Sequence, residues 1–212
     1  ILAYLYLILK KSKEKNIKIT RDLLRRAGQN IEYFPGVETW FDRINKYGQE
    51  KNVIVEHYII SSGMKEILEG TIISKYFKRI YACEFHYNED GEADWLSCAI
   101  NFTNKTQFIF RINKGNLEIY DDHGVNKYIP HEQREIPFEN MIYIGDGQTD
   151  VPCMKIVKAK GGKSIAVYES EDKLNMAKEL KDLGRINFYT QADYSKGSIL
   201  EQEIKNIINE IK

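Results

Sequence analysis

Two carboxylates, Asp146 and Asp150, lie in the segment Gly145-Asp146-Gly147-Gln148-Thr149-Asp150, which directly follows an apolar run. The preceding residues 141–144 are rich in β-branched and aromatic side chains and predict a short buried strand. Pro152 suits the first turn of a helix. Carboxylates in a strand-to-helix turn lie at the carboxyl edge of a sheet, where open α/β folds bind ligands. Since hard cations prefer oxygen ligands, we predict a Mg²⁺ site at Asp146 and Asp150.

A second predicted strand, Tyr58-Ile59-Ile60, leads into Ser61-Ser62-Gly63, and a short helix is expected over 64–69. Backbone N–H groups and a hydroxyl at such a turn form an anion site, because the unsatisfied donors and the helix dipole point at the ligand. An ordinary serine N-cap would leave the same pattern. Ser61, Ser62 and Gly63 are therefore candidate phosphate-binding residues.

Lys105 is the third candidate, and the segment Thr103-Asn104-Lys105-Thr106-Gln107 predicts that it lies in the first turn of a helix. A lysine there opposes the helix dipole. Two interpretations stay open from spacing alone: a solvated surface lysine, or a cation that faces a bound anion.

The composition limits the class of partner. The chain has 212 residues with 31 basic and 31 acidic side chains, so its charge does not indicate nucleic acid or an anionic membrane as the main partner. A small molecule is the expected ligand. The three cysteines, Cys83, Cys98 and Cys153, show no metal-binding spacing and suit a reducing cytosol, so we expect a cytoplasmic protein. Nothing in the sequence indicates the oligomeric state.

Strand and helix patterns alternate along most of the chain. This alternation predicts the α/β class, with a mostly parallel sheet covered on both faces. Strands are expected near 57–60, 79–85, 95–102, 141–144, 164–168 and 186–189, and helices over much of 1–30 and near 37–44, 64–69, 104–114, 171–183 and 200–211. Residues 116–137 are polar and predict a loop.

The chain order of Ser61, Lys105 and the Asp146/Asp150 pair resembles the haloacid dehalogenase superfamily of hydrolases, in its phosphoserine phosphatase-like branch. The family's second motif is an apolar strand ending in Ser or Thr, its third a lysine at a helix start, and its fourth the sequence GDGxxD. By this resemblance Ser61 would bind phosphoryl oxygens and Lys105 would neutralise charge. Asp146 would ligate Mg²⁺, and Asp150 would position metal-bound water or Lys105.

The resemblance also implies a three-layer, Rossmann-like core. We expect residues 1–32 to be part of a helical cap and residues 33–212 to be the core. The family's first motif, DxDx[TV], ends a central strand and supplies the nucleophile, but no such sequence precedes Ser61. Asp22 and Asp42 are the only earlier aspartates, and both fall in predicted helices. The first strand is therefore expected to be missing, and with it the N-terminal part of a longer protein.

Together these expectations predict that the chain is a fragment of a Mg²⁺-dependent phosphatase. The resemblance implies that the intact enzyme hydrolyses a small phosphomonoester through an aspartyl-phosphate, while this chain alone has no turnover. One alternative is a complete, non-catalytic module that binds phosphate or metal. A weaker alternative is a membrane-tethered form, since residues 1–9 are apolar. A membrane span would need about ten more apolar residues upstream.

Overall fold

The computed structural model describes residues 1–211, which form two units of the α/β class. Among the described residues, the first unit comprises 1–32 and 56–103, and the second comprises 33–55 and 104–211. One boundary falls between residues 32 and 33, where the sequence analysis ended the helical cap. The grouping of residues 56–103 with this N-terminal segment was not anticipated.

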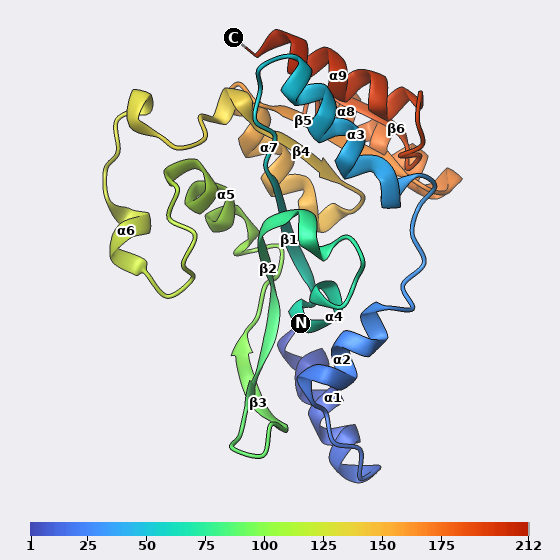
Figure 1. The fold of residues 1–212 in the computed structure, drawn as a ribbon, viewed down its shortest axis with the longest axis vertical. Coiled ribbons are helices and arrows are strands. Elements are labelled where there is room, and N and C mark those ends of the chain that lie inside the picture. Colours follow the sequence, from blue (N-terminus) through green and yellow to red (C-terminus); the bar gives the residue numbers. More distant parts are fainter. Residues whose placement is uncertain (212) are drawn as a thin grey trace. The chain divides into compact units, whose positions relative to one another are not determined.

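The first unit contains a mixed three-stranded sheet in the order β1-β2-β3 (Figure 1). β1 pairs with β2 in parallel, and β2 forms an antiparallel hairpin with β3, as the turn signal at 88–91 predicted. The elements are α1 (Leu2–Glu14), α2 (Arg21–Gly28), β1 (His57–Met64), α4 (Lys65–Glu69), η1 (Ser74–Tyr76), β2 (Phe77–Tyr87) and β3 (Ala93–Cys98). β1 continues through Ser61, Ser62 and Gly63 to Met64. The expectation that the strand ends before Ser61 is therefore wrong.

The local sequence explains the helices of the first unit. The Thr20 hydroxyl caps α2 by accepting a hydrogen bond from the Leu23 amide at 3.2 Å, which satisfies one of the free N–H groups at the helix start. α2 packs on α4, and α1 packs on β3. Leu5 and Leu9 lie four residues apart on α1, and both are buried.

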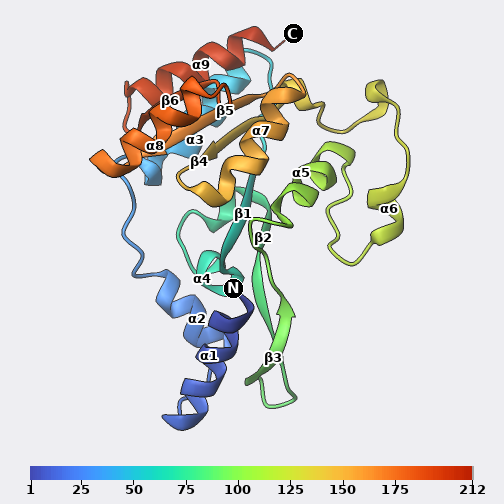
Figure 2. The same cartoon turned by 180° about the vertical axis from the view of Figure 1, so that it is seen from behind.

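The second unit is a three-layer structure around a parallel sheet in the order β4-β5-β6. Helices α3 and α9 cover one face of this sheet, and α7 and α8 cover the other (Figures 1 and 2). Its main elements are α3 (Val37–Glu50), α5 (Lys105–Lys114), β4 (Ile142–Gly145), α7 (Val151–Ala159), β5 (Lys163–Tyr168), α8 (Glu171–Asp182), β6 (Phe188–Gln191) and α9 (Ile199–Glu210). The strands of residues 1–211 therefore form two sheets instead of the one mostly parallel sheet that was predicted, and the sheet of β4, β5 and β6 is wholly parallel.

Apolar side chains at the predicted periods form the core of the second unit. Ala166 on β5 packs against Met154 of α7 and Leu180 of α8. Trp40 and Phe41 lie on the buried side of α3, as the helical period of residues 37–44 predicted.

The segment between α5 and β4 is mostly irregular, as predicted, but it contains α6 (Asp122–Asn126), η2 (His131–Gln133) and η3 (Phe138–Asn140). The buried Arg111 guanidinium of α5 donates to the carbonyl oxygens of Ile119 at 2.8 Å and Asp121 at 3.0 Å. A loop without a sheet partner gains its backbone hydrogen bonds in this way. No helix within residues 1–211 has the length and apolar character needed to cross a bilayer.

Candidate functional site

The candidate site lies in the second unit, at the turn between β4 and α7. β4 ends at Gly145, Asp146 follows it directly, and the 3₁₀ turn η4 (Gln148–Asp150) leads into α7. Pro152 occupies the first turn of α7, where its missing N–H costs no hydrogen bond. The predicted strand-to-helix turn is confirmed, and it holds both carboxylates at the carboxyl edge of the parallel sheet.

Gly145 lets the two halves of the turn approach closely. A Cβ atom at this position would lie 2.8 Å from Cβ of Asp150 and 2.7 Å from Cε of Met154. These separations are shorter than nonbonded carbon atoms tolerate, so any larger residue would push Asp150 away from the strand end. Glycine at position 145 thus allows the Asp150 side chain to pack closely against the end of β4.

Asp150 forms a buried ion pair with Lys105. The Lys105 ammonium lies 2.7 Å from Oδ1 of Asp150, and the two residues are only 5% and 6% exposed. The Tyr143 hydroxyl donates to the same Oδ1 at 2.7 Å. Since a buried charge is costly unless it is paired, the ion pair and the phenol together fix the position of the Lys105 ammonium.

Lys105 is the first residue of α5, as the sequence predicted. Of the two interpretations that spacing left open, the solvated surface lysine is excluded because the side chain is buried. Tyr143 was not singled out from the sequence; its pKa is raised by burial and by the neighbouring Asp150 carboxylate. A tyrosine within the apolar run just before Gly145 was the available signal, because a buried phenol needs a hydrogen-bond partner.

Asp146 differs from Asp150 because its side chain is 53% exposed. Its Oδ2 lies 2.8 Å from the ammonium of Lys173, which is on α8, and that ammonium is also 3.3 Å from Oε1 of Glu169. The pKa of Lys173 is raised, chiefly by the hydrogen bond with Asp146. Lys173 was not singled out from the sequence, although it lies near a helix start just as Lys105 does.

The loop between β6 and α9 brings Tyr194 to the same edge of the sheet. Burial raises the pKa of Tyr194 to about 12, and the Asp146 carboxylate adds to this shift. Its ring stacks on Phe34 at a centroid distance of 6.5 Å and meets the edge of Trp40 at 5.0 Å. Tyr194 is therefore a fixed aromatic neighbour of Asp146.

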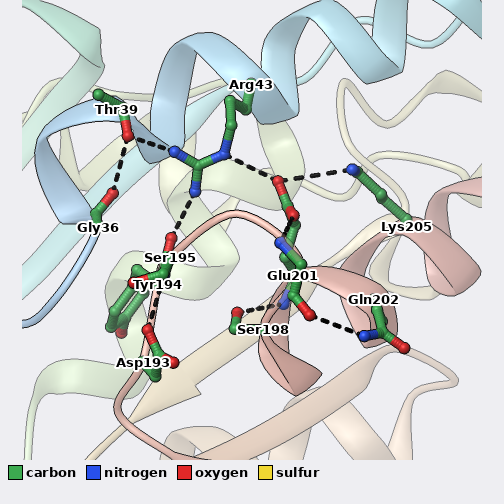
Figure 3. A network of polar contacts seen from close by, with 11 residues as sticks. Gly36, Thr39, Arg43, Asp193, Tyr194, Ser195, Ser198, Glu201, Gln202 and Lys205 are labelled. Atoms are coloured by element: carbon green, nitrogen blue, oxygen red, sulfur yellow. Dashed lines mark hydrogen bonds and ion pairs between the residues drawn. The ribbon is translucent and has the colours of Figure 1, made fainter.

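A partly buried ion pair holds this loop in place (Figure 3). Glu201 is 1% exposed, and its Oε1 lies 2.9 Å from Nε of Arg43. The Arg43 guanidinium also donates to the Tyr194 carbonyl, and the Gly197 amide donates to Glu201. Burial raises the pKa of Glu201, but the Gly197 amide and Arg43 outweigh it and leave the pKa below its usual range.

The two carboxylates of the turn differ in how well they fit a Mg²⁺ ion. Across residues 1–211 no three His, Cys, Asp or Glu side chains lie together as a metal-binding group. Mg²⁺ is often held by one or two carboxylates with water as its other ligands, so the exposed Asp146 carboxylate fits such an ion. Asp150 fits it less well, because its Oδ1 already accepts from Lys105 and Tyr143.

Ser61, Ser62 and Gly63 belong to the first unit and lie in β1. The Ser61 hydroxyl accepts a hydrogen bond from the Gly63 amide at 3.0 Å. The Ser62 hydroxyl oxygen is buried and has no hydrogen-bond partner among the residues described. Of the predicted site residues, the structure thus brings Lys105 and Asp150 into contact and places Asp146 in the same turn.

The fold and the site define an α/β protein with a buried lysine–carboxylate pair and an exposed carboxylate at the carboxyl edge of a parallel sheet. No family model matches the chain. A protein of Borreliella burgdorferi (strain ATCC 35210 / DSM 4680 / CIP 102532 / B31), described as an uncharacterized protein, is 31% identical over 197 residues, which cover 84% of this chain and 67% of the relative. The chain belongs to the family of this Borreliella protein.

Proposed function

We propose that the second unit is the metal- and phosphate-binding part of a Mg²⁺-dependent phosphomonoester hydrolase with the Rossmann-like core of the haloacid dehalogenase superfamily. The observation that carries the proposal is the buried ion pair of Lys105 and Asp150 beside the exposed Asp146. Phosphoryl transfer depends on positioning and on neutralising charge, so a fixed ammonium next to a carboxylate that can hold a cation suits this reaction.

Lys105 would neutralise charge on the phosphoryl group. An ammonium has three N–H donors, and within residues 1–211 this one donates to Asp150, which leaves donors for phosphoryl oxygens. Asp150 and Tyr143 would keep the ammonium in one position while the ligand enters and leaves. The phosphate-binding roles of Ser61, Ser62 and Gly63 stay predictions from the sequence.

Asp146 would hold the cation. Its carboxylate is exposed at the end of β4, so a hydrated ion can reach it without displacing a buried group. When bound, Mg²⁺ supplies charge neutralisation at the phosphoryl oxygens. Tyr194 and the Arg43–Glu201 pair would border the site on the side of β6 and limit the access of water.

Such a hydrolase uses a carboxylate nucleophile at the end of a central strand, and neither aspartate that precedes Ser61 lies in a strand. Asp22 lies in α2 and Asp42 in α3, as the sequence predicted. Among the described strands, β4 pairs only with β5, so it is an edge strand of this sheet. A parallel strand beside β4 that ends in a carboxylate would place a nucleophile next to Asp146, because the carboxyl ends of parallel strands meet at one edge.

The positions of Asp22 and Asp42 also favour a second candidate function, a non-catalytic module that binds phosphate or metal. Both the fragment of a hydrolase and the non-catalytic module should fail to hydrolyse p-nitrophenyl phosphate. An enzyme that is active on its own would hydrolyse it. We expect no turnover by this chain with Mg²⁺. Mg²⁺-dependent hydrolysis that disappears in Asp146→Ala would show that the chain carries its own nucleophile.

Cation binding at Asp146 can be tested directly. Mn²⁺, a paramagnetic substitute for Mg²⁺, should broaden the amide resonances of the β4–α7 turn, and Mg²⁺ should reverse the effect by competition. The Asp146→Asn variant should lose this broadening because it lacks the charged ligand. Asp182→Asn is the matched control, since Asp182 is an exposed carboxylate at the end of α8. Broadening that persists unchanged in Asp146→Asn would refute the proposed function.

A further inference from the structure

Lys173 connects two loops at the carboxyl edge of the parallel sheet. Its ammonium lies 2.8 Å from Oδ2 of Asp146, in the β4–α7 turn, and 3.3 Å from Oε1 of Glu169, just after β5. The Lys173 side chain is 33% exposed, so solvent reaches it. Lys105, by contrast, is buried with Asp150 and has a fixed position.

The stability of α8 gives little reason for a lysine at position 173. Lys173 is the third residue of this helix, where a positive charge opposes the helix dipole. Its ion pairs are partly exposed, and pairs of this kind contribute little to folding. In the structure Lys173 is the counter-charge of Asp146, the carboxylate to which the proposed function assigns the cation.

We propose that Lys173 is a positioning residue that makes the binding of a divalent cation and of a phosphate group at Asp146 depend on each other. The inference rests on the proposed function. A cation at the Asp146 carboxylate and the Lys173 ammonium repel each other because they share one counter-charge. The ammonium alone therefore weakens cation binding.

A phosphate group reverses this effect. It carries negative charge into the site, and the flexible four-carbon stem of Lys173 lets the ammonium turn from Asp146 toward a phosphate oxygen. The Asp146 carboxylate is then left to the cation, while the phosphate attracts both the cation and the ammonium. Each ligand accordingly raises the affinity for the other, and the two effects are equal by thermodynamic linkage.

The test is a Mg²⁺ titration followed by the amide chemical shifts of the β4–α7 turn, with and without inorganic phosphate. In the unaltered protein, phosphate should lower the Kd for Mg²⁺. In Lys173→Met, Mg²⁺ alone should bind roughly tenfold more tightly, as expected when a neighbouring positive charge is removed in water. Phosphate should then have a much smaller effect on the Kd.

Lys178→Met is the matched control, because Lys178 is an exposed lysine of the same helix and its loss changes the net charge equally. The inference is overturned if Lys173→Met and Lys178→Met have the same Kd values in both conditions. It is also overturned if Lys173→Met binds Mg²⁺ more tightly but keeps the full effect of phosphate.

The Asp146→Asn variant separates this inference from the proposed function. If Asp146→Asn leaves the Mg²⁺ titration unchanged, the cation does not bind at Asp146, and both the proposed function and the inference are refuted. If Asp146→Asn abolishes the shifts while Lys173→Met behaves like its control, only the role of Lys173 is refuted.

Discussion

The Asp150→Ala substitution should destabilise the second unit strongly, because it leaves the Lys105 ammonium buried without a counter-charge. Lys105 and Asp150 are 5% and 6% exposed, and their charged atoms are 2.7 Å apart, so water screens the pair little. Breaking a buried pair by removing one partner costs about 3–5 kcal/mol. In Lys105→Met/Asp150→Ala neither charge remains, so the double variant should lose less stability than the two single variants added together. We expect a coupling energy of about 2–3 kcal/mol.

Urea unfolding followed by tryptophan fluorescence measures this coupling. The chain has two tryptophans. Trp40 is 4% exposed in α3 of the second unit, whereas Trp95 is 65% exposed in β3 of the first. A Trp95→Phe background therefore makes the signal specific for the second unit.

The pair of Asp146 and Lys173 is the control for this cycle. It has a similar N–O distance of 2.8 Å, but its side chains are 53% and 33% exposed. Solvent-exposed ion pairs contribute at most about 1 kcal/mol, so its coupling energy should be much smaller. A coupling energy for Lys105 and Asp150 within about 0.5 kcal/mol of zero would refute the reasoning, because independent sites add to that accuracy.

Two further predictions concern pH and the turn itself. Burial lowers the pKa of His57 to about 4 from its ordinary value of 6.5. As the pH falls from 6.5 towards 4, the unfolded chain binds a proton that the folded chain excludes, so stability present above pH 6.5 is lost. Thermal unfolding at pH 7 and pH 4.5 should show that His57→Gln loses about 2 kcal/mol less than the unaltered protein, and equal losses would contradict this. Gly145→Ala should cost about 1–3 kcal/mol through overpacking against Asp150. Gly147→Ala, whose Cβ would come no closer than 3.9 Å to a neighbour, should cost clearly less in the same urea assay, and similar costs would argue against close packing at Gly145.

Much of the secondary structure was predictable from the sequence because it depends on local patterns. The helical period of the apolar residues predicted α3 and α9, and the alternation of strands and helices predicted the α/β class. The polar residues 88–91 gave the hairpin between β2 and β3. The end of β1 was misplaced, because Ser61, Ser62 and Gly63 have a low strand preference and pairing with β2 is not a local property.

The division into two sheets was not predictable in the same way. Strand pairing depends on contacts between residues far apart in the chain. The local sequence of a strand does not show which other strand it will pair with. The strands near residues 57–60 and 79–85 were predicted from local patterns. Their membership of a different sheet from β4, β5 and β6 was not predicted.

For the candidate site, the sequence by itself determined which residue types lie in the β4–α7 turn and that Lys105 begins a helix. The tertiary structure decided what these residues do to one another. It buried Lys105 against Asp150, left Asp146 exposed, and added Tyr143, Lys173 and Tyr194 to their surroundings. Burial and long-range contacts set the energy of a charge, and both arise only when distant segments pack together.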